Sequence, residues 1–480
     1  MGIGLVIFAA SAIQAAPCSV EGMPATFDRD QRVECGWVSV PLNAKTGKSI
    51  RLWTARVRAD SPTPARDTII YINGGPGIAT VDPVLGGLPS GKLMPALRKE
   101  RDIILFDQRG SGRSEQALCP TLAKALNEIS QKALSPQAED DERRAAYVTC
   151  RNEATKAGHD LNDYSTRQTV ADIEALRRAF GVSQWNLQSI SYGSLVALDA
   201  MRTNPATIRA VVLNSPFPPN SVTWAEQVSS AAAGYDMIDR ACAVQPACRV
   251  RFGALVPKLE AVLARLENQP LRDGTTMITG RQFAKALWPL AVRSATVRFV
   301  PLAIDRAHKG DDKLIKTMVK VLAGGDAFGG YSPAQSDAIS CPESGRTTAW
   351  YQRARALYPA LTPASPDDGW DRMCAAFKPG FVDPTFFAPV ASNIPTLIYA
   401  GSLDLATPLV DAYQAMRFLS NATLIEVLGA AHGPMSINDC TRAIGVAFLS
   451  RPDVRPDTSC MTKQPTPKFA TEGLDEMLAS

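Results

Sequence analysis

Two parts of the chain alternate short apolar runs with amphipathic segments. Short segments rich in apolar and β-branched residues, typical of buried strands, occur at residues 68–72, 102–106, 185–188, 209–213 and 395–400. Helices between such runs would cover both faces of a parallel sheet. Ahead of them, residues 33–40 and 50–57 alternate polar and apolar side chains, which predicts a leading pair of antiparallel strands. The pattern therefore predicts an α/β fold with a mostly parallel central sheet.

The strand pattern stops after Pro219 and returns near residue 394. The residues between read mainly as helices with loops. A chain of 480 residues is also longer than one plain α/β domain needs, so an inserted module is expected. We therefore divide the chain into a signal segment at 1–16, a first core part at 17–215, an inserted helical cap at 216–393 and a C-terminal core part at 394–480.

Ser191 lies on a predicted turn between a strand and a helix that begins near Leu195. The residues two positions away on each side, Ser189 and Gly193, are small. A nucleophile on such an elbow needs small residues there, because larger side chains would collide with the strained turn. Serines flanked by small residues are common, so this assignment depends on partners elsewhere in the chain.

Asp404 and His432 follow Ser191 in the order of a Ser-Asp-His triad. Asp404 comes directly after a buried-type strand, and His432 lies on the loop after the next strand. Because these loops lie at one edge of a parallel sheet, all three side chains are expected to meet there. Of the three histidines, only His432 follows a strand. Asp411 is a weaker alternative for the acid, because it falls within the following helix.

A glycine-rich loop at residues 73–77 follows the first apolar run of the core. Glycine lets a bare backbone approach a substrate carbonyl. We expect the N–H groups of Gly75 and Tyr192 to form an oxyanion hole. In this hypothesis His432 takes the proton from Ser191, and Asp404 orients and stabilises the imidazole.

Four segments resemble one family of enzymes. Asn-Gly-Gly-Pro-Gly at 73–77 is similar to the His-Gly-Gly-Pro-Gly loop of proline iminopeptidases, and residues 107–114 resemble their Asp-Gln-Arg-Gly segment. The elbow at 191–194 also matches, and residues 401–408 resemble the secreted tripeptidyl-aminopeptidase-like branch. The resemblance extends from about residue 33 to residue 460 and is weakest in the middle third. It departs from the family where Asn73 replaces His and Ser189 replaces Gly. It implies the α/β-hydrolase fold and a serine aminopeptidase activity.

Within residues 107–114, Gly110 and Gly112 predict a tight loop at the active edge of the sheet. Arg109 is expected to fix that loop by pairing with a buried carboxylate. We interpret this segment as structural support rather than as a catalytic participant.

The triad predicts acyl transfer but not the acyl group. The resemblance implies an exopeptidase that hydrolyses peptide bonds near a free N-terminus through an acyl-enzyme, so its partners would be such peptides. A carboxylate on the cap is suited to hold the desolvated ammonium. Glu343 is the candidate, because residues 337–343 resemble the cap of the tripeptidyl branch. A carboxylesterase on the same core and a hydrolase-fold binding protein without catalysis are the alternatives.

Ten cysteines fall into five pairs of sequence neighbours. In an oxidising compartment the simplest pairing is sequential, namely 18–35, 119–150, 242–248, 341–374 and 440–460. The alternative is a set of free thiols in a cytosolic protein. An apolar run at residues 4–10, followed by small residues, is typical of a signal peptide, although it lacks a basic start. We therefore expect export to the periplasm or the extracellular space.

The composition excludes several other classes of function. The net charge of +4 is small, and no basic run interleaved with aromatic residues indicates nucleic-acid binding. The leading apolar run is too short to span a membrane. The cysteine spacing does not suggest zinc, and we expect neither a metal nor a cofactor. Oligomeric state is not predicted.

Overall fold

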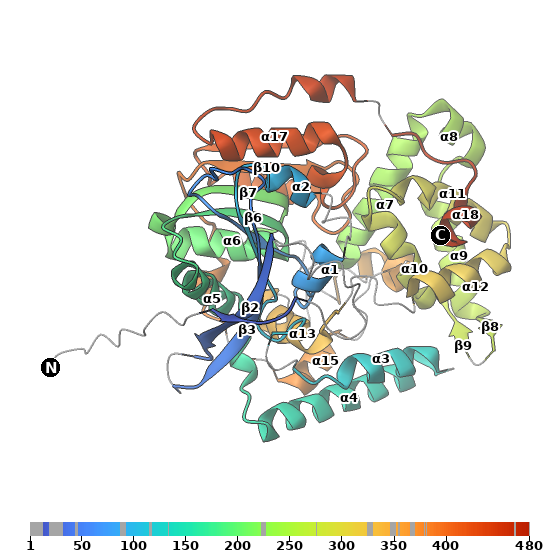
Figure 1. Ribbon diagram of the computed structural model, residues 1–480. Coiled ribbons are helices and arrows are strands. Elements are labelled where there is room, and N and C mark those ends of the chain that lie inside the picture. Colours follow the sequence, from blue (N-terminus) through green and yellow to red (C-terminus); the bar gives the residue numbers. More distant parts are fainter. Residues whose placement is uncertain are drawn as a thin grey trace.

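The computed structural model describes residues 13–18, 32–43, 47–86, 93–114, 118–132, 134–221, 227–274, 276–323, 330–345, 352–353, 356–364, 370–378, 380, 382–464 and 467–479. In these residues a central sheet carries helices on both faces, and further helices lie to its right and below it in the view of Figure 1.

Nine strands among the described residues form one sheet, in the order β1-β2-β3-β5-β4-β6-β7-β10-β11. Their bounds are Gln14–Ala15 (β1), Val33–Pro41 (β2), Ser49–Val57 (β3), Ile69–Ile72 (β4), Ile103–Phe106 (β5), Trp185–Ser191 (β6), Ile208–Pro216 (β7), Thr396–Gly401 (β10) and Ala422–Val427 (β11). The last six strands of that order are mutually parallel, and β1 to β3 form an antiparallel edge. The predicted fold class is therefore confirmed. Strands β6 and β7 extend a few residues beyond the predicted segments, because the pairing of the two strands continues through Ile190 with Asn214 and Ser191 with Pro216.

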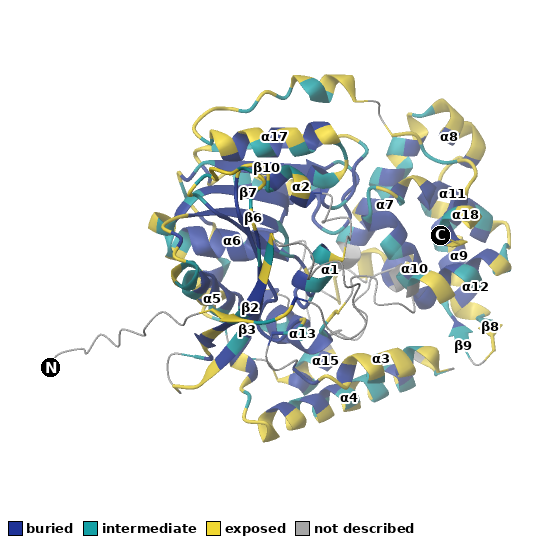
Figure 2. Ribbon diagram, viewed as in Figure 1, coloured by how far each residue is buried: buried dark blue, intermediate teal, exposed yellow. Residues whose placement is uncertain are grey.

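Helices cover both faces of the sheet. One face shares an apolar cluster with α5 (Thr166–Ala179), α6 (Tyr192–Thr203) and α16 (Leu409–Met416). The other face packs against α1 (Val81–Leu85), α2 (Met94–Leu97) and α17 (Asp439–Ser450). The central strands are consequently buried along most of their length (Figure 2). This burial on both faces is the reason that these strands are rich in apolar residues.

The helices between residues 216 and 393 form two groups. One group packs around its own apolar cluster, which the short C-terminal helix α18 (Leu474–Ala479) joins. Its helices are α7 (Gln227–Ala243), α8 (Pro246–Phe252), α9 (Val256–Asn268), α10 (Gly280–Val292), α11 (Val300–His308) and α12 (Asp312–Met318). A small hairpin, β8 (Leu271–Asp273) with β9 (Thr276–Ile278), follows α9.

The second group combines two helices that precede Ser191 in the sequence with two that follow it. Helices α13 (Pro333–Glu343) and α15 (Trp370–Phe377) share an apolar cluster with α3 (Leu122–Gln131) and α4 (Pro136–Lys156). These four helices lie together below the sheet in Figure 1. The predicted division assigns α3 and α4 to the core, yet they pack with helices of the predicted cap. The domain boundaries stay a prediction.

The five cysteine pairs adopt the sequential connectivity expected from the sequence. Their Cα–Cα distances run from 5.1 to 5.8 Å. Two of the bridges lie in the second helical group: Cys341–Cys374 joins α13 to α15, and Cys119–Cys150 joins the segment just before α3 to α4.

Residues 1–12 of the predicted signal segment lie outside the described residues. The next residues, Gln14 and Ala15, form β1, which pairs with Trp37 and Gly36 of β2. Across the described part of the chain, no helix combines the length and apolar character that a membrane span requires.

Candidate active site

Ser191 occupies a tight elbow between strand and helix. It is the last residue of β6 and the N-cap of α6, with φ 54° and ψ −130°. A positive φ is uncommon for a residue other than glycine and is frequent at functional sites. Helix α6 begins at Tyr192, earlier than the predicted start near Leu195, so no loop separates strand from helix. A Cβ at Gly193 would lie 2.2 Å from the carbonyl oxygen of Ile72, which explains the small residue there.

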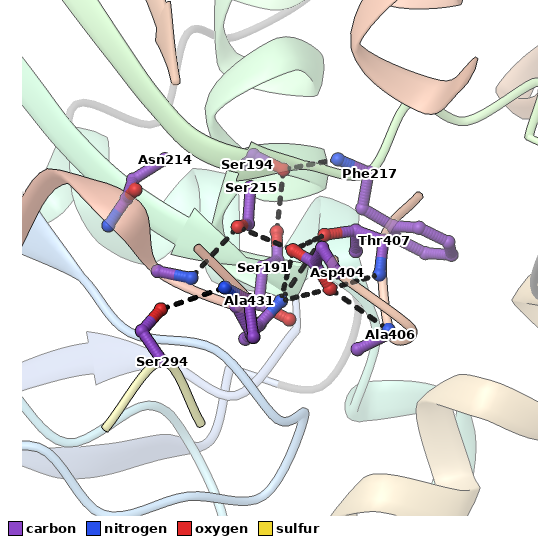
Figure 3. A network of polar contacts seen from close by, with 12 residues as sticks. Ser191, Ser194, Asn214, Ser215, Phe217, Ser294, Asp404, Ala406, Thr407 and Ala431 are labelled. Carbon is purple, nitrogen blue, oxygen red and sulfur yellow. Dashed lines mark hydrogen bonds and ion pairs between the residues drawn. The ribbon is translucent and has the colours of Figure 1, made fainter. Parts of the chain in front are cut away.

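Asp404 and His432 are hydrogen-bonded to each other. Nδ1 of His432 lies 2.9 Å from Oδ2 and 3.1 Å from Oδ1 of Asp404. The carboxylate is fully buried just after β10 and also accepts hydrogen bonds from the backbone of Ala406 and from Thr407, at 2.9 to 3.0 Å (Figure 3). Asp411, the weaker candidate, lies on α16 and accepts a hydrogen bond from Ser221.

The surroundings of Asp404 favour its ionised form. Burial alone would raise the pKa of this carboxyl group. The ring of His432 and the hydrogen bonds from Thr407 and Ser215 outweigh that effect and hold the pKa below its usual value. An ionised carboxylate at Nδ1 is suited to stabilise an imidazolium.

Ser191 and His432 lie on neighbouring segments. A Cβ at Gly433, next to His432, would lie 3.0 Å from Cδ1 of Ile190, next to Ser191. Among the described residues, the Ser191 hydroxyl has no hydrogen-bond partner in this structure. Such bonds commonly tighten only when substrate binds. The catalytic roles of Ser191, Asp404 and His432 stay predictions.

Ser215 is a further member of this network, and the sequence does not indicate its role. Its hydroxyl donates to Oδ2 of Asp404 at 2.8 Å and accepts from the backbone N–H of Gly433 at 2.9 Å (Figure 3). The side chain is fully buried at the end of β7, and its φ is 59°. Ser215 thus joins the aspartate to the histidine loop. Its only sequence signal is a polar residue at the end of an apolar strand.

The first helical group also contacts the histidine loop. The carbonyl oxygen of Val292 accepts from the N–H of His432 at 3.0 Å. The hydroxyl of Ser294 accepts from the N–H of Ala431 at 2.9 Å. A segment of the inserted region therefore supports the backbone at the candidate general base.

The glycine-rich loop lies beside the elbow. A Cβ at Gly74 would lie 2.9 Å from Cβ of Ser191 and 3.5 Å from its hydroxyl oxygen. The N–H of Gly74 donates to the side chain of Asn73 at 2.9 Å. Gly75 has φ +111°, which strongly favours glycine. Gly75 and Tyr192, the predicted oxyanion donors, thus belong to segments that meet at Ser191.

Residues 107–114 brace this edge of the sheet. The guanidinium of Arg109 binds both oxygens of Asp172, at 2.8 and 2.6 Å, and both side chains are buried. The predicted pairing of Arg109 with a buried carboxylate is thus confirmed. Asp107 accepts hydrogen bonds from Thr80, Val81 and Arg113. Burial nevertheless raises the pKa of Asp107 to about 6.

Glu343 ends α13, and its side chain is only 3% exposed. One carboxyl oxygen accepts a hydrogen bond from the backbone N–H of Thr166 at 2.8 Å, and the other lies 2.5 Å from the Thr166 hydroxyl oxygen, within hydrogen-bond distance. Burial raises the pKa of Glu343 to about 8 despite these bonds. The expectation that Glu343 anchors a substrate amine stays a prediction, but its carboxyl group already has partners within the protein.

Within the described residues, no group of three or more His, Cys, Asp or Glu side chains is arranged to hold a metal ion.

Two family models match the chain. The α/β hydrolase fold matches residues 67–250, which include Ser191, and the TAP-like protein family matches residues 362–460, which include Asp404 and His432. Residues 251–361, where α13 and Glu343 lie, fall between them.

Individual relatives are distant. A putative hydrolase, YuaR, from Escherichia coli is 26% identical over 50% of this chain and 48% of its own length. A tripeptidyl aminopeptidase from Streptomyces coelicolor is 26% identical over 45% of this chain and 41% of its own length. The chain thus spans less than half of these relatives.

Among solved structures, a proline iminopeptidase from Mycobacterium smegmatis is 15% identical, with a TM-score of 0.44 over 87% of this chain and 98% of that one. The chain therefore has the α/β hydrolase fold, and its sequence is similar to TAP-like proteins and to relatives named tripeptidyl aminopeptidase and proline iminopeptidase.

Proposed function

We propose that this protein is an exported serine aminopeptidase that hydrolyses peptide bonds near a free N-terminus. The observation that carries the proposal is the buried Asp404 carboxyl group hydrogen-bonded to His432, beside a serine on a strained elbow, and the lowered pKa of Asp404 agrees with it. Relatives named tripeptidyl aminopeptidase and proline iminopeptidase support the choice of peptide substrates. The five disulfides support an oxidising location outside the cytosol.

The proposed reaction has two stages. The Ser191 oxygen attacks the peptide carbonyl while His432 accepts its proton, and the N–H groups of Gly75 and Tyr192 stabilise the tetrahedral oxyanion. His432 then protonates the leaving amine, and an acyl-enzyme forms on Ser191. Water, deprotonated by His432, hydrolyses this ester and restores the enzyme. Asp404 stays ionised and stabilises the imidazolium in both stages.

A carboxylesterase is the second candidate, and one observation favours it. Glu343, the expected anchor for a substrate ammonium, is buried against Thr166. Without an amine anchor, the same triad would hydrolyse simple esters equally well.

Two experiments test the proposal. A fluorophosphonate probe is expected to label Ser191, and Ser191→Ala is expected to abolish both labelling and turnover, a loss of several orders of magnitude. Label on Ser189 or Ser194 would refute the assignment of the nucleophile. A panel of fluorogenic amides with one, two or three free N-terminal residues is then compared with N-acetylated versions and short acyl esters. Equal cleavage of blocked and free peptides would favour the esterase.

A further inference from the structure

We propose that helix α13 braces both halves of the oxyanion hole, with Glu343 as the positioning residue for Tyr192. The inference rests on the proposed function, because it assigns Glu343 a role through the Tyr192 N–H in that reaction. It differs from the sequence-based expectation, in which Glu343 binds the amine of the substrate.

The end of α13 reaches Tyr192 through one threonine. Thr166 begins α5 and binds both carboxyl oxygens of Glu343. The same threonine hydroxyl lies 2.9 Å from the hydroxyl of Tyr192. All three side chains are buried. Tyr192 directly follows Ser191 and begins α6, so its side chain helps to fix the backbone N–H beside the nucleophile.

The hydrogen bonds stay connected in either protonation state of Glu343. With an ionised Glu343, Tyr192 donates to Thr166, and Thr166 donates to the carboxylate. With a protonated Glu343, the carboxyl group donates to Thr166, and Thr166 donates to Tyr192. Burial raises the pKa of Glu343 to about 8, which favours the protonated form at neutral pH. A glutamine can make the same donor and acceptor pattern as this neutral acid.

The start of α13 holds the other half of the oxyanion hole. The N–H of Ser332, the N-cap of α13, donates to the carbonyl oxygen of Gly77 at 2.8 Å. Contact is so close that a Cβ at Gly77 would lie 2.5 Å from the Ser332 carbonyl oxygen. Residues Ile78 and Tyr331 form a β-bridge between the same segments. Gly77 lies two residues after Gly75, so α13 is tied at its two ends to the two predicted donor segments.

The spacing of those donors decides how well they stabilise an oxyanion. Effective donors lie about 2.7–3.1 Å from the position of the negative oxygen. A displacement of about 1 Å can cost on the order of a hundredfold in rate. Loss of the link at Glu343 should therefore lower the rate of acyl transfer without weakening substrate binding.

The test compares Glu343→Ala, Glu343→Gln and Tyr192→Phe with the wild-type full chain. Tyr235→Phe is the matched control for Tyr192→Phe. Tyr235 is also a buried tyrosine, but its hydroxyl, unlike that of Tyr192, has no hydrogen-bond partner among the described residues. Three quantities are measured: kcat and KM for an unblocked peptide amide, the same constants for a short acyl ester, and the rate at which a fluorophosphonate labels Ser191. Thermal unfolding confirms that each variant is folded.

We expect Glu343→Ala to lower kcat and the labelling rate about tenfold or more for both substrates, with KM within about twofold. Glu343→Gln should recover most of that loss, and Tyr192→Phe should reproduce part of it. If Glu343→Ala does not fold, Glu343→Gln and Tyr192→Phe carry the test.

Two results would overturn the inference. One is a Glu343→Gln variant whose KM rises for the unblocked peptide only, as an amine anchor requires. The other is wild-type labelling rates in both Glu343→Ala and Tyr192→Phe. If Ser191 of the wild-type protein is not labelled at all, the proposed function fails and the inference fails with it. If the wild type is labelled and one of the two results above is found, only the inference fails.

Discussion

At the scale of single residues, the most informative positions have strained backbones. Ser191 and Ser215 both have positive φ values, of 54° and 59°. Such conformations cost about 1–3 kcal/mol each and persist only where the surroundings impose them. Ser191 was predictable because its small neighbours form a recognisable elbow. Ser215 was not, because a serine at the end of a strand is ordinarily a turn residue, and its partners Asp404 and Gly433 are remote in sequence.

Ser215→Ala should therefore impair catalysis more than binding. The variant loses the hydrogen bond to Asp404 and the acceptor for the N–H of Gly433. A hydrogen bond to a charged group contributes about 1.5–3 kcal/mol, so we expect kcat to fall about tenfold to a hundredfold with KM little changed. Steady-state kinetics with one substrate provides the measurement. Ser450→Ala, at an exposed site on α17, is the control. A Ser215→Ala variant with kcat within twofold of wild type would show that Asp404 does not depend on this residue.

At the scale of elements, apolar runs predicted the strands well but not the packing of the inserted helices. A strand buried on both faces has a simple signature, and β4 to β7 lie within a few residues of their predicted positions. Helices α3 and α4 lack an equivalent signature for their partners, because an amphipathic helix packs on any complementary apolar surface. Their association with α13 and α15 is a tertiary property.

The Arg109–Asp172 pair should be a main support of the edge of the sheet. Besides Asp172, the guanidinium of Arg109 donates to the carbonyl oxygens of Leu42 and Asp163. Asp172→Asn leaves a buried cation without its carboxylate, so we expect a loss of about 3–5 kcal/mol in the free energy of unfolding. Urea denaturation measures it. Asp236→Asn removes a partner from the more exposed ion pair with Arg240 and should cost less than about 1 kcal/mol. Equal losses in both variants would contradict the structural role of Arg109.

At the scale of the whole molecule, contacts between residues close in the sequence could be predicted, whereas contacts between residues far apart could not. The disulfides follow sequential order, with sequence separations of only 6 to 33 between partners, so neighbouring cysteines were a sound guide. The order Ser, Asp, His along the chain likewise indicated one edge of the sheet. Glu343 and Thr166 are 177 residues apart, and nothing local to either residue indicates their contact. The resemblance therefore suggested a substrate-binding role for Glu343, and only the packing of α13 against α5 reveals its partners.

Buried acids should make the stability of the whole protein fall as the pH rises above 5. Glu343 holds its proton up to a pKa of about 8, against an ordinary value of 4.5, and Asp107 up to about 6, against 3.8. Between the unfolded and the folded pKa, the folded state binds more protons, so raising the pH favours unfolding. Each unit of pKa difference corresponds to about 1.4 kcal/mol. Burial lowers the pKa of Lys285 to about 8. This group makes stability rise with pH, but only above about pH 8, where the folded state has released the lysine proton and the unfolded chain still holds it.

Glu343→Gln isolates this effect, because glutamine keeps the hydrogen-bond pattern of the protonated acid and does not titrate. Wild-type stability should fall as the pH rises, because the folded protein holds a proton on Glu343 that the unfolded chain releases, whereas glutamine does not titrate. We therefore expect the free energy of unfolding of the variant, minus that of the wild type, to rise by a few kcal/mol between pH 5 and pH 8. Urea denaturation at pH 5, 6, 7 and 8 measures the difference, and groups common to both proteins, including Asp107, cancel. A difference that stays constant with pH would show that Glu343 titrates near its ordinary value. The carboxyl group would then be ionised at neutral pH, and Thr166 would have to donate to it rather than to Tyr192.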